Sequence, residues 1–122
     1  MGEEHFVYYA RGNPQGLPAG YYEVIRDTPF SLLKHTRQKY IERVDQTAVS
    51  LLRYFETMEH YYLIKDDVVY PLTGRKSLLR ALPDQKRALS RWISQQGLRI
   101  KGQAEKFYAQ SVNYYVSLLK QD

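Results

Sequence analysis

The chain has 122 residues, 43% hydrophobic and 25% charged, which is the composition of one folded domain and not of a disordered segment. It carries a formal net charge of +5 and contains no cysteine, which excludes disulfide bonds, thiolate metal sites and cysteine nucleophiles. No apolar run approaches the roughly 20 residues that cross a bilayer, so we expect no membrane span.

The first third of the chain has the composition of β-strands. Residues 5–10 and 21–26 are dense in aromatic and β-branched side chains. The glycines and prolines of residues 11–20 predict a loop between these two strands. An extended pattern resumes at residue 30 and continues toward residue 44. We therefore expect strands that follow one another through the first 44 residues.

Residues 45–58 are ambiguous, and we interpret them as a short helix. Asp45 is a plausible helix N-cap. Apolar side chains follow at helical spacing, among them Leu51, Phe55 and Met58. The β-branched residue Val49 and its neighbours also suit a strand, so the alternative stays open.

Residues 61–72 predict a β-hairpin, because two apolar runs flank the polar turn Lys65-Asp66-Asp67. Three amphipathic helices are expected after it, at about 75–82, 83–96 and 102–119. Pro83 suits the first position of a helix, and Gly97 suits a left-handed C-terminal cap. The predicted fold class is α+β, with a small antiparallel sheet of four or five strands packed by C-terminal helices.

The apolar positions of these elements predict the hydrophobic core. Trp92 belongs to the expected buried stripe of the second helix, so Trp92→Ala is predicted to cost about 3–5 kcal/mol. The predicted core residues are Val7, Val24, Leu33, Leu63, Val69, Leu79, Leu89, Trp92, Ile93, Phe107, Val112, Tyr115 and Leu119.

Several short blocks of this sequence recur in a known family. They are YYEVI at 21–25, FSLLK at 30–34, YYLIKD at 61–66, VYPL at 69–72, LPDQK at 82–86 and VNYY at 112–115. In this order they resemble an uncharacterised family of envelope or secreted proteins from Bacteroidetes-type Gram-negative bacteria. Members of that family begin with a signal peptide, and a β-rich part precedes the region resembled.

The resemblance implies that residues 1–122 are a single domain, the C-terminal domain or a fragment of a longer exported protein. It implies a location in the periplasm or cell envelope, and no activity. The expected partners are other envelope proteins or the N-terminal part of the same protein. No signal peptide is present in these residues, so a cytoplasmic location is the alternative.

No residue pattern predicts catalysis, a metal or a cofactor. The three histidines are scattered, and the serines lie in no nucleophile elbow or related box. Glu56 and His60 would share one face of a helix, but two ligands do not make a metal site. We therefore expect a non-catalytic structural or protein-interaction module.

Tyrosine, with 12 residues, is the candidate for a partner surface, because its ring buries a large area while its hydroxyl stays in water. In each strand doublet one tyrosine should face the helices and the other should face outward. If Leu63 points inward, Tyr61 does too and Tyr62 points outward. The alternative is that both faces are covered. The candidate partner surface consists of Tyr8, Tyr22 and Tyr62.

The positive charge is concentrated in the helical part. Residues 73–106 contain nine lysines and arginines against two acidic residues. Such a patch keeps a protein soluble, or it attracts nucleic acid or another anionic partner. A nucleic-acid-binding module is therefore the alternative function, with candidate residues Arg75, Lys76, Arg80, Lys86, Arg87, Arg91, Arg99 and Lys101.

Overall fold

The computed structural model describes residues 6–27, 29–45 and 50–120. Its five strands form one antiparallel sheet in the order β1-β2-β3-β4-β5, so each strand pairs with its neighbours in the sequence. The strands are β1 (Phe6–Tyr9), β2 (Gly20–Arg26), β3 (Ser31–Asp45), β4 (Ser50–Lys65) and β5 (Val68–Leu72).

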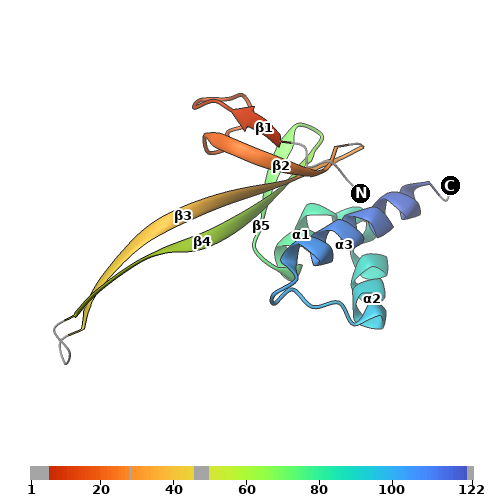
Figure 1. Cartoon of the computed structure of the whole chain (residues 1–122). Helices are drawn as coiled ribbons and strands as arrows, with labels where there is room; N and C mark the ends of the chain where they lie inside the picture. The colour runs from red at the N-terminus through yellow and green to blue at the C-terminus, as the bar shows by residue number, and fades with distance from the viewer. Residues whose placement is uncertain (1–5, 28, 46–49, 121–122) are drawn as a thin grey trace.

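Helices follow the sheet and cover one face of it (Figure 1). They are α1 (Arg75–Ala81), a single 3-10 turn η1 (Pro83–Gln85), α2 (Lys86–Gln96) and α3 (Ala104–Leu119). The predicted α+β class, the five-stranded sheet and the C-terminal helices are confirmed. Among the described helices, none is long and apolar enough to cross a membrane.

Of the turns and caps expected in the second half of the chain, the hairpin turn and the cap at Gly97 are confirmed. Asp66 and Asp67 both have positive φ angles, 53° and 63°, as a two-residue hairpin turn requires. Gly97 is the left-handed C-cap of α2, with φ of 64°. Pro83 begins the 3-10 turn and not α2, which starts at Lys86.

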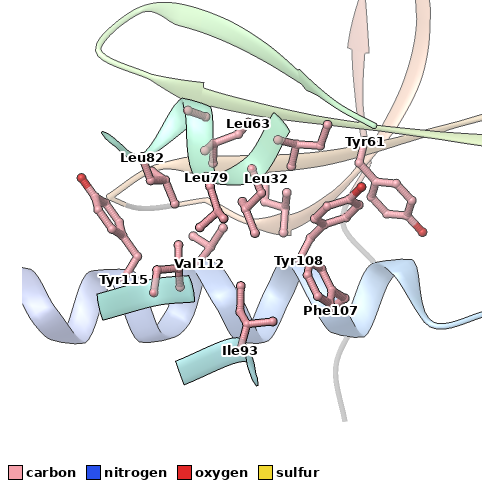
Figure 2. Close-up of a cluster of buried hydrophobic side chains, with 14 of the residues drawn as sticks. Leu32, Tyr61, Leu63, Leu79, Leu82, Ile93, Phe107, Tyr108, Val112 and Tyr115 are labelled. Atoms are coloured by element: carbon pink, nitrogen blue, oxygen red, sulfur yellow. The ribbon is translucent and has the colours of Figure 1, made fainter. Parts of the chain in front are cut away.

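The main core lies between the sheet and the helices. Leu32, Tyr61 and Leu63 point from the central strands toward α3, where Val112 and Tyr115 meet them (Figure 2). Leu79 and Leu82 close this core from α1 and the residue that follows it. The expectation that Tyr61 and Leu63 share the helix side of the sheet is confirmed.

A second, smaller cluster lies on the other face of the sheet. Tyr22 and Leu33 are buried there, and Tyr62 packs against them. Leu17, from the loop between β1 and β2, is buried in the same cluster. A segment of the chain itself therefore closes part of the second face.

Five residues of the predicted core are less buried than expected. Trp92 is only half-buried; its ring stacks on Tyr114 with 4.5 Å between the centroids. Leu119 is 38% exposed at the last turn of α3. Both belong to helices, and the spacing of apolar residues alone does not reveal how much of each side chain other elements cover. Val7, Val24 and Val69 are half-buried members of the second cluster.

The predicted helix over 45–58 is wrong. Residues 50–58 belong to β4, and Asp45 ends β3; residues 46–49 lie outside the described part of the chain. β4 pairs with β3 without interruption from Asp45↔Ser50 to Ser31↔Ile64. This long ladder satisfies the backbone groups that a helix would otherwise pair locally. Non-local pairing thus overrides the helical spacing of Leu51, Phe55 and Met58.

Candidate functional site

The two central strands extend far beyond the rest of the sheet and form a two-stranded arm (Figure 1). We define the arm as residues 36–45 of β3 and 50–60 of β4. Pairing of β3 with β2 ends at His35, and pairing of β4 with β5 begins at Tyr61. Ten residues of β3 give the arm a length of about 33 Å. Within the described residues, each strand of the arm is paired on one side only.

Cross-strand contacts hold the arm together. The rings of Tyr40 and Phe55 meet edge to face, with 5.5 Å between their centroids. In the next pair of the same face, Arg53 Nε lies 3.2 Å from Glu42 Oε1. Tyr40 donates a hydrogen bond of 3.0 Å to the same carboxylate oxygen. Such pairs stabilise a two-stranded ribbon, which is marginal without them.

A charged cluster fixes the root of the arm to α3. Lys34 Nζ donates a 2.9 Å hydrogen bond to Glu105 Oε1 and lies 3.8 Å from Glu59 Oε1. Tyr61 donates a 2.8 Å hydrogen bond to the other oxygen of Glu59. The bond to Glu105 raises the pKa of Lys34, and burial together with the Glu59 carboxylate raises that of Tyr61. We interpret this cluster as a structural contact that joins the start of the arm to α3.

Beyond its root, the arm exposes a set of large apolar side chains on both faces. Phe55 is the most exposed of them, at 64%. A soluble chain exposes single apolar residues freely, but a cluster of them on one projecting element is typical of a contact surface. The exposed apolar residues of the arm are Tyr40, Leu51, Tyr54, Phe55 and Met58.

The three tyrosines predicted as a partner surface are not brought together. Tyr62 and Tyr22 lie on the same face, with their rings 5.9 Å apart. Tyr8 pairs with Tyr21 in the β1–β2 ladder, so alternation along β2 places it on the opposite face from Tyr22. Tyr8 and Tyr21 are both exposed, and their rings lie 4.9 Å apart.

Tyr22 does face away from the helices, but its expected exposure is wrong, because its side chain is fully buried in the second cluster. Its hydroxyl donates a 2.6 Å hydrogen bond to the Pro18 carbonyl, and its ring stacks on His35. Burial raises the pKa of Tyr22 to about 12. Tyr62 does face away from the helices, but it is half-buried against Tyr22. The loop that carries Leu17 and Pro18 folds over this face and removes it as an open tyrosine surface.

Among the predicted basic residues, Arg75 has a structural role. Its guanidinium donates hydrogen bonds of 2.9 Å to the Ser90 carbonyl, 2.8 Å to Ser90 Oγ and 2.9 Å to Ser94 Oγ. These bonds join α1 to α2. Arg75 is therefore committed to the contact between two helices.

Three of the other basic residues converge. Lys76, Arg80 and Lys86 line one hollow, whose remaining lining residues are Leu79 and Pro83. Within the described part of the chain, none of the three cations forms an ion pair. Arg87 lines the neighbouring hollow beside Asp84. The remaining exposed basic residues lie in neither hollow; they are Arg91, Arg99 and Lys101.

The histidines and carboxylates form no recognisable catalytic or metal centre. Among the described residues, no three histidine or acidic side chains lie close enough together to hold a metal ion. Glu56 and His60 do not share a helix turn, because both lie in β4, where four residues span about 13 Å. His35 stands opposite His60 across the ladder, but it is buried, and burial is the main cause of its lowered pKa.

The extended pattern expected toward residue 44 matches the first strand of the arm, but its second strand and its extension beyond the sheet were not predicted. Residues 36–45 and 50–60 contain no glycine or proline, and both segments mix charged residues with aromatic and β-branched ones. That pattern was the available signal.

The chain matches no protein-family model, no curated protein and no solved structure. The arm and the basic hollow are therefore the two features of the molecule that bear on its function. The arm offers apolar side chains and unpaired strand edges, whereas the hollow offers unpaired positive charge.

Proposed function

We propose that this chain is a non-catalytic protein-interaction module of an exported bacterial envelope protein, and that the arm is its contact surface. The observation that carries the interaction role is the arm itself. A two-stranded ribbon gains little stability by extending so far from its core, and an unpaired edge is a template for another strand. The exposed apolar side chains of Phe55 and its neighbours on this projecting arm favour a role in binding.

The envelope location rests on the resemblance of the six sequence blocks. The arm begins after the block at 30–34 and ends before the block at 61–66. The blocks thus lie in the helices and in the part of the sheet outside the arm. The contact surface that we propose is made by residues outside the blocks. In this proposal the helical part is the scaffold, and the arm determines the partner.

Site-specific photo-crosslinking in the native source cells tests the interaction role. A benzophenone amino acid in place of Phe55 should form a discrete covalent protein adduct after irradiation. The same probe in place of Arg91, an exposed residue of α2, should form none. An equal yield from both positions, or no adduct from position 55, would contradict the proposed contact surface.

Cell fractionation tests the location separately. An antibody to this domain should detect the native protein in the periplasmic or outer-membrane fraction. Recovery in the cytoplasmic fraction would remove the envelope part of the proposal while leaving the crosslinking result to be judged by itself.

The basic hollow supports nucleic-acid binding as the second candidate function. Three cations that form no ion pair with any described residue line one concave site, which suits phosphate groups. If they engage about three phosphates of duplex DNA, the logarithm of affinity should fall with the logarithm of salt concentration with a slope near −3. Charge reversal at Lys76 and Arg80 should abolish this binding. Absence of binding by the parent protein at low salt would dismiss the candidate.

A further inference from the structure

The two outer edges of the arm differ in charge. On β3, Arg37, Lys39 and Arg43 all lie on one face, because they are spaced by even numbers of residues. If β3 paired with a second copy of itself about its middle, cations of that face would oppose one another. Lysines and arginines arranged in this way protect an edge from association. The β3 edge is therefore the protected one.

On β4, an arginine and a glutamate share one face at matched distances from the middle of the strand's arm segment. Arg53 and Glu59 lie on one face of β4, three positions before and three positions after Glu56. Both keep much of their side chains exposed, 62% for Arg53 and 44% for Glu59. An antiparallel copy of the same strand can therefore place each arginine opposite the other copy's glutamate.

We propose that the β4 edge of the arm pairs with the same edge of a second copy of this chain, antiparallel and about a two-fold axis at Glu56. This inference rests on the proposed function, because it names the partner of the arm. The pairing converts two two-stranded arms into one four-stranded sheet. The two bodies then lie at opposite ends of it, since the arm points away from the helices (Figure 1).

The two-fold axis limits the register. Residues that face one another across the axis must lie on the same face of the sheet, so their positions differ by an even number. With Glu56 at the centre, Arg53 faces Glu59, Tyr54 faces Met58 and Phe55 faces Thr57, each pair occurring twice. The paired segment ends at His60, the last residue before β4 acquires β5 as its neighbour. The register therefore uses only the part of the β4 edge that β5 does not cover.

Charge pairs within each chain also agree with the register centred on Glu56. Lys39 pairs with Glu56 in the β3–β4 ladder, so the two glutamates at the axis are each flanked by a lysine on the same face. Glu42 pairs with Arg53, so each intermolecular ion pair would extend an existing one. The neighbouring register, centred on Phe55, sets Leu51 against Glu59 and leaves Arg53 opposite Thr57. Charge complementarity therefore favours Glu56 as the centre.

The absence of cysteine from the sequence allows a direct test with single-cysteine variants of the full chain. Residues directly opposite across an antiparallel ladder have Cα atoms about 5 Å apart, which suits a disulfide. Mild oxidation should convert Glu56→Cys to a covalent dimer. Lys39→Cys is the matched control, because the two copies of position 39 would be about 14 Å apart, too far for a disulfide.

Light scattering and charge reversal test the noncovalent dimer. The parent protein should have the mass of two chains, and Arg53→Glu should weaken dimerisation at least about tenfold by opposing Glu59. The double variant R53E/E59R should restore the dimer, provided that circular dichroism shows the parent fold. Rescue of this kind separates an intermolecular ion pair from general damage to the arm.

A parent protein that stays monomeric at every accessible concentration, with Glu56→Cys crosslinking no faster than Lys39→Cys, would overturn the proposal. Faster crosslinking of Phe55→Cys than of Glu56→Cys would overturn its register. If the photo-crosslinker at position 55 still captures a different protein from cells, the proposed function stands and only the choice of partner fails.

Discussion

Two leucines of β4, Leu63 in the body and Leu51 in the arm, show how differently the same strand is used. We call the sheet outside the arm, together with its helices, the body. Both leucines lie on the same face, because twelve residues separate them. Leu63 has no exposed surface, whereas Leu51 is 47% exposed.

The difference comes from what lies over that face. The helices pack over Leu63, whereas the arm extends away from them (Figures 1 and 2). Burial is thus a property of the neighbours and not of the strand. In the body the strand contributes stability, and in the arm the same residue type is available for contact with another molecule.

The largest difference between body and arm is expected for alanine substitution at these two positions. Leu63→Ala should lower the free energy of unfolding by about 2–5 kcal/mol, because it leaves a cavity in the main core. Leu51→Ala should change it by less than about 1 kcal/mol. Chemical denaturation of both variants gives the comparison. Equal losses would mean that the arm packs against something within the chain.

Trp92→Ala tests an intermediate degree of burial. The ring is half-buried and stacked on Tyr114, so we expect a loss of about 1–3 kcal/mol, below the 3–5 kcal/mol predicted from the sequence. The Tyr114→Ala variant and the double variant complete a cycle that isolates the stacking contribution. A loss near that of Leu63→Ala would place Trp92 with the core after all.

Acid should lower the stability of the protein through His35, which lies at the boundary between body and arm. Burial lowers its pKa below the ordinary value of 6.5, with smaller contributions from Arg37 and His60. The unfolded chain therefore takes up this proton at a higher pH than the folded chain, and stability falls as the pH drops below 6.5. His35→Gln should flatten the dependence of the unfolding free energy on pH over this range. An unchanged slope would show that His35 is protonated equally in both states.

The smallest effect on stability is expected from shortening the arm. Thr36 and Glu59 face one another in the ladder, so an Asn-Gly turn can join them in place of residues 37–58. At low protein concentration, this variant should unfold with a free energy within about 1 kcal/mol of the parent, because no described side chain of the arm belongs to either buried cluster. A large loss would mean that body and arm form one cooperative unit.

The sequence by itself determined the local elements of this protein. Two adjacent aspartates specified the hairpin turn at 66–67, Gly97 specified a helix end, and the spacing of apolar residues located α2 and α3. These features depend on backbone preferences within a few residues, so they are readable one segment at a time.

Only the tertiary structure decided the rest. The burial of Tyr22 depends on the loop that carries Leu17. The partial burial of Trp92 depends on how the helices are arranged. The strand at 50–58 depends on pairing with β3. The structure and burial of a strand depend on its neighbours, because other parts of the chain provide its hydrogen-bond partners and cover its buried face.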